Sequence, residues 1–266
     1  TVTIQSLSAI QGSLVVSPKL SSVTTSQTLQ LAVRTVGVTS KDVTWAADGI
    51  TGGNGAVGII SASGLYTPPL ATGPHLITAV LNANPNAVGS ATVEVTGFPG
   101  TLTWRNDNSR SGVNSQELAL APSTVSSSTL GKLFSCPIDG YAYAQPLYMP
   151  NLAIPGKGTH NVIFVATEKD LVFAFDADAS PCVQLWVQNS LIPAGSQAIM
   201  APSLQIASTD IVPFIGITGT PVISASTSVL YVVAATQTIA TNPTFSRRLY
   251  ALDLATEQTV IRSAGI

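Results

Sequence analysis

Short apolar runs, each bounded by polar turn residues, recur along the whole chain of 266 residues. The clearest example is the stretch NVIFVATEKDLVFAFDADASPCVQLW at 161–186. Its runs at 162–166 and 171–175 are too short for helices and are rich in β-branched and aromatic residues, which is typical of buried strands. Because only a short charged turn, Glu168 to Asp170, separates the two runs, they are predicted to form an antiparallel hairpin.

Two more predicted strands complete this unit. Residues 182–187, which include Trp186, follow the sequence DADASP at 176–181. There Asp and Ser side chains bond nearby backbone and Pro ends strand pairing. Residues 141–148 (YAYAQPLY) supply a fourth strand upstream. The pattern therefore predicts one four-stranded antiparallel unit.

A second copy of this unit follows near the C-terminus. TPVIS at 220–224 corresponds to QPLYM at 145–149, VLYVVA at 229–234 to VIFVA at 162–166, and RRLYALDLAT at 247–256 to DLVFAFDADA at 170–179. Repeats of four antiparallel strands with aromatic markers are typical of β-propeller blades. The long Pro-, Ser- and Ala-rich connection at 189–215 is expected to be an irregular structural excursion.

The Ala-x-Asp turn and the trailing Trp resemble the quinoprotein-like (PQQ-like) β-propellers, a family of pyrroloquinoline-quinone dehydrogenases and non-catalytic relatives. The resemblance covers 101–266, and its most specific pieces are WRNDNSRSGVN (104–114), DGYAYAQPLY (139–148), HNVIFVATEKDLVFAFDAD (160–178) and GITGTPVI (216–223). It implies a lead-in segment at 101–136, in which LGKLFSC at 130–136 is an outer strand that closes the ring. A propeller needs at least about four blades, so two blades and one such strand are expected to be a fragment of a longer chain.

Residues 1–97 are predicted to form a separate β-domain. Alternating runs at 14–18, 28–36, 43–47, 57–61, 75–83 and 91–97 are separated by Gly, Pro, Asn and Ser clusters. About seven short strands in this length are typical of an immunoglobulin-like sandwich. VTWAADG (43–49) and GIISASGLYTPP (58–69) resemble the bacterial immunoglobulin-like (Big-type) domains of surface and adhesion proteins. Because the domain has no cysteine, Trp45 is expected to pack on aliphatic residues, and TGFPG at 96–100 marks the boundary with the second domain, 101–266.

Composition narrows the class of protein. The chain is 45% hydrophobic and only 9% charged, against a usual charged share of about 25%. This favours an all-β, turn-rich protein that is extracellular, on the cell surface or periplasmic. The formal net charge is −2, and Arg247-Arg248 is the largest basic cluster, so nucleic-acid binding is not expected. No apolar run reaches the ~20 residues of a membrane span, and Thr1 is interpreted as a processed, engineered or truncated start.

The two cysteines, Cys136 and Cys182, leave two alternatives open. A disulfide between them would stabilise the fold by about 4 kcal/mol on the chain-entropy model. However, Cys136 ends one predicted outer strand and Cys182 begins the next, so they are expected on opposite faces. The favoured prediction is therefore two buried, inert thiols.

The ionisable residues are each assigned a structural role. His160 is separated by the length of a strand from Glu168 and Asp170, so it is expected to cap a loop rather than bind metal. His75 stands alone at a strand start. The pair Asp176 and Asp178 lacks the further oxygen ligands of a calcium loop. Because an Asp recurs at 253, these residues are expected to bond their own turns.

Other motifs are interpreted in the same way. Arg105, Asp107 and Arg110 are expected to form a buried ion-pair network that pins the lead-in segment, with ligand binding as the alternative. GGNG at 52–55 is expected to be a turn, because no helix or Lys follows it to hold a phosphate. No Gly-x-Ser-x-Gly elbow is present, and neither His lies near a Ser–Asp pair, so the sequence gives no support for hydrolase chemistry.

The sequence thus predicts an immunoglobulin-like sandwich followed by a partial β-propeller of about two blades. The leading hypothesis is a non-catalytic extracellular scaffold or interaction module whose partners are proteins or surface glycans. The alternative is a piece of a quinone-dependent dehydrogenase whose active-site residues lie in other blades, and a weaker one is a carbohydrate-binding surface protein. Family resemblance implies that quinone and calcium sit on the propeller axis, so with two blades we expect no cofactor, metal or catalytic residue in this chain.

Overall fold

The structure, a computed structural model, describes residues 13–37, 40–117, 120, 122, 125–126, 131–132, 134–204, 210–256 and 258–262. Within these residues the regular elements are strands and one 3-10 helix, so the predicted all-β class is confirmed. The chain divides into two compact units, one made of 1–98 with 116–131 and the other of 99–115 with 132–266. The domain bounds 1–97 and 101–266 remain a prediction.

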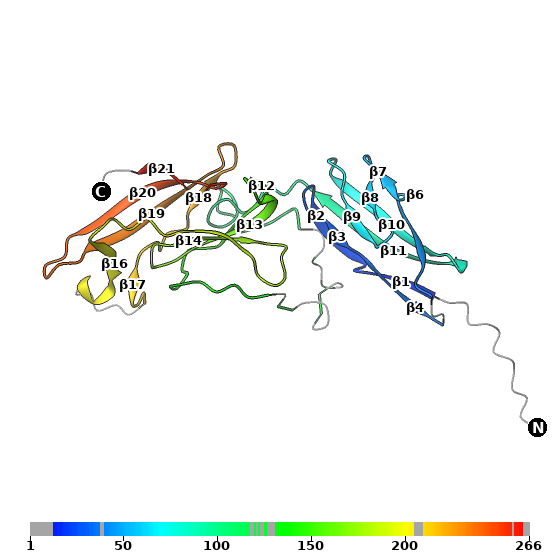
Figure 1. The fold of residues 1–266 in the computed structure, drawn as a ribbon, viewed down its shortest axis with the longest axis horizontal. Helices are drawn as coiled ribbons and strands as arrows, with labels where there is room; N and C mark the ends of the chain where they lie inside the picture. Colours follow the sequence, from blue (N-terminus) through cyan, green and yellow to red (C-terminus); the bar gives the residue numbers. More distant parts are fainter. Residues whose placement is uncertain are drawn as a thin grey trace, which may run out of the picture. The chain divides into compact units, whose positions relative to one another are not determined.

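The first unit is built from three sheets in its described part (Figure 1). Their orders are β2-β11-β10-β5-β6, β3-β9-β8-β7 and β1-β4. The strands are β1 (Ser13–Ser17), β2 (Leu20–Thr24), β3 (Leu29–Gln30), β4 (Ala32–Val36), β5 (Val43–Ala47), β6 (Ile50–Thr51), β7 (Gly53–Asn54), β8 (Gly58–Ile60), β9 (Leu65–Thr67), β10 (Gly73–Leu81) and β11 (Asn84–Thr96).

One apolar core joins these sheets. Along β10 every second side chain is buried, including Ile77, Ala79 and Leu81, because successive side chains of a strand point to opposite faces. Trp45 lies in the same core among mainly aliphatic residues, as expected. At Gly64, whose φ is +85°, a Cβ would lie 2.4 Å from the Leu31 carbonyl oxygen, so this turn requires glycine.

The longest strand of this unit differs from its prediction. A strand was expected only at 91–97, whereas β11 begins at Asn84. The turn from β10 takes only Asn82 and Ala83, and the hairpin register then runs from Leu81↔Asn84 to Gly73↔Val95. Alternation of apolar and polar residues did not predict residues 84–90 as strand. They are in strand conformation because they pair with β10. The immunoglobulin-like topology remains a prediction.

The second unit contains two sheets in its described part (Figure 1). The first has the order β12-β13-β14-β15 and the second β17-β16-β19-β20-β21, with β18 also pairing with β19. Their strands are β12 (Leu147–Ile154), β13 (Gly158–Ala166), β14 (Val172–Asp176), β15 (Gln184–Gln188), β16 (Ser196–Met200), β17 (Phe214–Ile215), β18 (Val222–Ser224), β19 (Val229–Thr238), β20 (Phe245–Asp253) and β21 (Thr259–Arg262). The 3-10 helix η1 (Ala201–Leu204) follows β16.

The predicted internal repeat appears as one pairing register used twice. In the first sheet Phe164 lies between Leu147 and Ala174, and Ala174 pairs in turn with Trp186. In the second sheet the corresponding row is Val222, Tyr231, Ala251 and Ile261. Both sheets also have an irregularity directly after the paired Ala, between Ala174 and Phe175 and between Ala251 and Leu252.

The two sheets of this unit share one core. From the first sheet it contains the side chains that face the same way as Phe164, namely Leu147, Val162, Ala166, Val172, Ala174 and Trp186. From the second sheet it contains the alternate set, namely Leu230, Val232, Ala234, Tyr250 and Leu252. Trp186 Nε1 also donates a hydrogen bond to the Leu254 carbonyl, 3.0 Å away. The sheets therefore pack face to face, with non-equivalent faces in contact.

Three predictions for this unit need correction. Of the expected strand at 141–148 only the last two residues are in β12, because Pro146 has no N–H to donate and pairing starts after it. None of the described residues in 130–136 forms a strand. The connection at 189–215 is more regular than expected, since it contains β16, η1 and β17, and β16 extends the second sheet through β19.

The cysteines form a disulfide, so the prediction of two free thiols is wrong. The Cα atoms of Cys136 and Cys182 lie 5.4 Å apart, inside the usual range for a bridge. The argument from opposite faces failed because the described residues around Cys136 are not in a strand, so their side chains belong to no sheet face. The bridge attaches the segment before β12 to the turn between β14 and β15.

Replacing both Cys136 and Cys182 by Ser is expected to lower the free energy of unfolding by about 4 kcal/mol. The two cysteines are 46 residues apart in sequence, and the bond between them reduces the entropy of the unfolded chain by closing this loop. Urea unfolding monitored by circular dichroism measures this, and wild-type protein under reducing conditions should match the variant. Two titratable thiols in the unreduced, denatured wild type would contradict the bond.

Candidate functional site

The turn between β13 and β14 carries two buried carboxylates. Glu168 is 1% exposed and Asp170 is fully buried. Asp170 adopts a left-handed conformation with φ +56°, which Asp tolerates better than most residues. Sequence reasoning identified this turn but not the burial of its acids.

Glu168 binds the chain just before β18. Its Oε2 accepts hydrogen bonds from the Gly216 N–H at 2.7 Å and the Thr218 hydroxyl at 3.0 Å. Beside it the Ile217 N–H donates to the Thr167 carbonyl at 3.3 Å. This turn of the first sheet is therefore tied to the segment that leads into the second sheet.

Asp170 occupies a gap along one edge of β19. β18 pairs with residues 229–231 of β19 and β16 with residues 236–238, so no strand of the described residues pairs with 232–235 on that side. The Ala235 N–H in this gap donates to Asp170 Oδ1 at 3.3 Å. A Cβ on Gly216 would lie 2.7 Å from the same oxygen and 2.5 Å from the Glu168 carbonyl oxygen, so close packing here requires glycine.

The surroundings of this turn disfavour negative charge on its two carboxyl groups. Glu168 Oε1 and Asp170 Oδ2 are buried and have no hydrogen-bond partner among the residues that the structure describes. Burial, opposed by the Ala235 hydrogen bond and assisted by the nearby Glu168 carboxylate, raises the pKa of Asp170 to about 8. Near neutral pH Asp170 is therefore largely protonated.

A pocket of about 360 Å³ opens beside this turn. Its lining residues are Asp139, Gly140, Tyr141, Glu168, Lys169, Pro213 and Phe214. Lys169 Nζ lies 2.7 Å from Asp139 Oδ1 and 5.5 Å from the centre of the Phe214 ring. The pocket therefore combines aromatic walls with one ion pair.

His160 does not join the buried acids, as expected from its position. Its Nδ1 lies 2.8 Å from Asp176 Oδ2 and its Nε2 lies 2.9 Å from the Lys157 carbonyl oxygen. The partner Asp176 was not foreseen, although it stands opposite Val162, near His160 in the β13–β14 ladder. The contact holds the β12–β13 turn against the end of β14.

The aspartates of the repeat bond their own turns, as predicted. Asp176 Oδ1 accepts from the Asp178 N–H at 2.9 Å. Asp253 Oδ1 accepts from the Ala255 N–H at 2.9 Å and the Thr256 N–H at 2.8 Å. Asp178 additionally accepts from the Asn161 side chain at 2.7 Å.

The motif with Arg105, Asp107 and Arg110 is not a buried ion-pair network. Both arginines are exposed. Arg105 lies over the Trp104 ring, 4.9 Å from its centre, and Arg110 donates to the Trp104 carbonyl at 2.9 Å. Hydrogen bonds from the Ser109 and Ser111 side chains lower the pKa of Asp107 to about 2. The prediction failed because serines close by in sequence, not arginines, satisfy this carboxylate.

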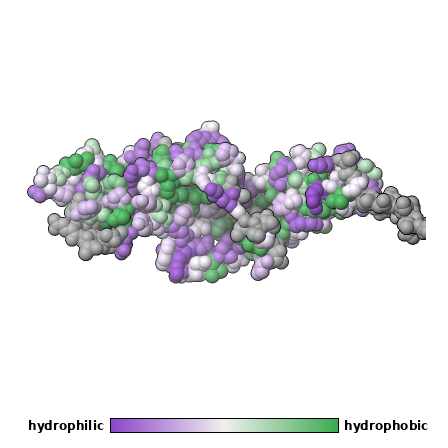
Figure 2. Space-filling view, turned by 90° about the horizontal axis from the view of Figure 1, so that it is seen from below, coloured by the Kyte–Doolittle hydropathy of each residue, from purple (hydrophilic) through white to green (hydrophobic). Residues whose placement is uncertain are grey.

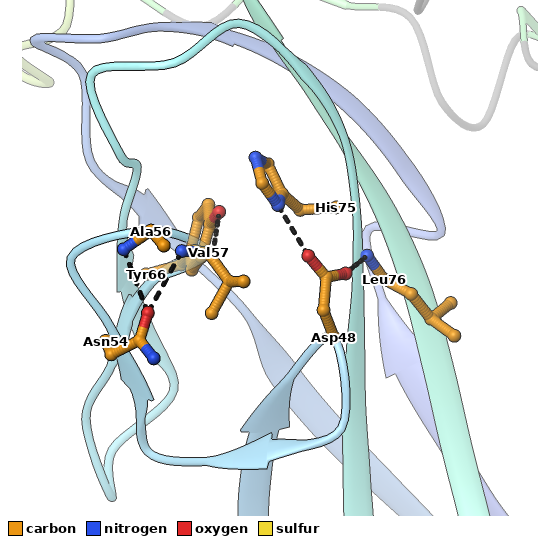
Figure 3. A network of polar contacts seen from close by, with 7 residues as sticks. All are labelled: Asp48, Asn54, Ala56, Val57, Tyr66, His75 and Leu76. Atoms are coloured by element: carbon orange, nitrogen blue, oxygen red, sulfur yellow. Dashed lines mark hydrogen bonds and ion pairs between the residues drawn. The ribbon is translucent and has the colours of Figure 1, made fainter.

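His75 in the first unit is not isolated, contrary to expectation (Figure 3). Its Nδ1 lies 2.7 Å from Asp48 Oδ2, while Asp48 Oδ1 accepts from the Leu76 N–H at 2.7 Å. The turn after β5 brings Asp48 next to β10, a pairing that local sequence does not reveal. The Tyr66 hydroxyl donates to the Val57 carbonyl at 2.8 Å, and burial, followed by the Asp48 charge, raises the pKa of Tyr66 to about 12.

The turn expected at 52–55 is shifted, because Gly53–Asn54 form strand β7 and the turn follows at 55–57 (Figure 3). Asn54 Oδ1 accepts from the Ala56 N–H at 2.9 Å and the Val57 N–H at 3.3 Å. In the described part of the chain no three His, Cys, Asp or Glu side chains come together as a possible metal site. Nor is any described helix long and apolar enough to cross a membrane.

Comparisons with known proteins give little information. No protein-family model matches the sequence, and no curated protein matches it. Among solved structures the chain is similar to one described as protocadherin gamma B7 extracellular cadherin domains 1–4, with 9% identity and a TM-score of 0.26. The alignment covers 91% of this chain and 49% of the other, so the chain spans about half the length of that structure. A TM-score this low supports no conclusion on fold or function.

Replacing Asp170 by Asn is expected to remove one component of the pH dependence of stability. Because the pKa of Asp170 rises from 3.8 to about 8 on folding, the folded state binds more protons than the unfolded state between these values. Stability from this group is therefore fully present below pH 4 and is lost as pH rises towards 8, by at most about 1.4 kcal/mol per pH unit.

Urea unfolding at a series of pH values between 4 and 9 measures this slope. The Asn variant keeps an oxygen for the Ala235 N–H, and it should exceed the wild type in stability at the alkaline end. Asp210→Asn, at an exposed aspartate in the same unit, is the matched control and should keep the wild-type slope. A wild-type slope in Asp170→Asn would refute the assignment.

Proposed function

We propose that this chain is an exported, non-catalytic scaffold that binds partners through β-sheet surfaces. It combines a bacterial immunoglobulin-like sandwich with the first two blades of a quinoprotein-like β-propeller. The observation that carries the proposal is the repeat itself, since two sheets with one register pack face to face through non-equivalent faces. Such packing can continue from sheet to sheet.

The repeat identifies one open surface. The first-sheet residues Leu147, Phe164, Ala166 and Val172 are all buried. Their counterparts in the second sheet by register, Val222, Tyr231, Val233 and Leu249, are between 37% and 43% exposed. We call these four residues the outer face. Positions that cover a neighbouring sheet in the first copy are thus uncovered in the second.

This surface suits association with another protein. Phe245, which is 45% exposed, lies on the same face of β20 as Leu249, and the exposed Arg247 lies between them. Figure 2 shows hydrophobic patches among hydrophilic residues on one side of the molecule. Contiguous exposed apolar residues on a soluble protein mark interaction surfaces.

The disulfide supports the proposed location. Bonds such as Cys136–Cys182 persist in oxidising compartments, namely the extracellular space, the cell surface and the periplasm. A chain with 9% charged residues also relies on polar uncharged side chains for its surface. Both features fit an exported scaffold better than a cytosolic one, and we therefore infer export.

The outer face is expected to drive self-association of the isolated chain. Light scattering coupled to size exclusion, at several concentrations, should give a mass that rises with concentration for the wild type. The double variant Val233→Lys, Leu249→Lys should stay monomeric, because charges on the face oppose its burial.

The matched control is Ile59→Lys, at a residue that is 55% exposed in the first unit. It should associate like the wild type. A wild type that stays monomeric at every concentration would remove the support that the outer face gives to the scaffold proposal.

Titration with pyrroloquinoline quinone and calcium tests the non-catalytic part of the proposal. We expect no change in quinone absorbance and no dye-linked oxidation of alcohols or sugars above the rate of free cofactor, because cofactor enzymes must bind and orient their cofactor. Micromolar binding with turnover would instead favour the alternative, a piece of a quinone-dependent dehydrogenase.

A further inference from the structure

The pocket beside the buried acids has the size of a small-ligand site. Its volume of about 360 Å³ falls within the range of about 300–1,000 Å³ found for ligand pockets. Three separate segments line it, namely 139–141, 168–169 and 213–214. Neither the scaffold proposal nor the outer face makes use of it.

The walls of the pocket are aromatic and held in place. Tyr141 is 61% exposed, and its carbonyl accepts the Glu168 N–H at 2.9 Å, which fixes its backbone. Phe214 is half-buried in β17. Gly140, with φ +92°, adds no side chain to the lining, and a Cβ there would lie 3.1 Å from Lys169. Because Lys169 Nζ lies over the Phe214 ring, 5.5 Å from its centre, the exposed Tyr141 ring is the main aromatic surface for a ligand.

The polar groups of the pocket are both donors and acceptors. Lys169 Nζ and Asp139 Oδ1 form an ion pair of 2.7 Å, and their side chains are 36% and 64% exposed. The Glu168 side chain, which also lines the pocket, is buried, and its Oε1 has no partner in the described part of the chain. One ammonium group and one carboxylate are thus presented beside the rings.

We propose that this pocket binds a single neutral sugar ring of a surface glycan. The C–H face of a pyranose stacks on an aromatic ring, and its hydroxyls both accept from an ammonium group and donate to a carboxylate. An anion is disfavoured by the carboxylates of Asp139 and Glu168, which both line the pocket. A cation has to displace Lys169 from both Asp139 and Phe214.

This inference rests on the proposed function, because it names the glycan partner of an interaction module. The pocket shares no residue with the outer face, whose residues are in β18, β19 and β20. Sugar binding and self-association can therefore be measured separately. If sugar binding is not observed, the self-association experiment can still be interpreted, and the reverse also holds.

The test is a titration of the isotopically labelled full chain with four probes, the methyl glycosides of glucose, galactose and mannose and N-acetylglucosamine. Nuclear magnetic resonance should show shifts at 139–141, 168–169 and 214 for at least one probe. The expected dissociation constant is on the order of 1 mM, as suits a ligand of this size.

Tyr141→Ala should raise the dissociation constant at least about tenfold, because it removes the exposed ring. Asp139→Asn should weaken binding less, since it retains an acceptor oxygen. Tyr231→Ala, at an exposed tyrosine on the outer face, is the matched control and should bind sugar as the wild type does. Absence of shifts with all four probes, or unchanged binding in Tyr141→Ala, would overturn the inference, whereas self-association would still test the scaffold proposal on its own.

Discussion

The second unit depends on a short turn that carries two carboxylates into the junction between its sheets. Thr167 to Asp170 receive hydrogen bonds from Gly216, Ile217, Thr218 and Ala235, all of which belong to the second sheet or its approach. Removing carboxylates from water is costly unless donors replace the water. Here part of the water is replaced by backbone N–H groups that are not used in strand pairing.

The position of this turn follows from a difference between the two copies of the repeat. In the first copy the ladder stops at Ala166↔Val172, whereas in the second it continues from Val233↔Leu249 to Gln237↔Phe245. The shorter hairpin of the first sheet brings Asp170 to the gap in the edge of β19. The longer hairpin of the second sheet provides the extra residues that pair with β16. One repeat thus gives two sheets with different edges.

Strands and their pairing were largely predictable, because apolar alternation and turn chemistry are local signals. The equivalence of Phe164 with Tyr231 and of Ala174 with Ala251 came from sequence alone, and the registers confirm it. Contacts between distant segments were not predictable in this way. The pairing of Asp48 with His75, the bond between Cys136 and Cys182, and the burial of Glu168 each depend on which segments meet in space.

The candidate site was missed for the same reason. A charged triplet in a three-residue turn is ordinarily a solvated hairpin tip, and nothing in residues 168–170 distinguishes a buried one. The available signal lay about fifty residues downstream, in Gly216 before the second copy. Gly216 leaves no room for a side chain beside Glu168 and Asp170. This glycine therefore marks a close approach between its backbone and the turn that carries the buried carboxylates.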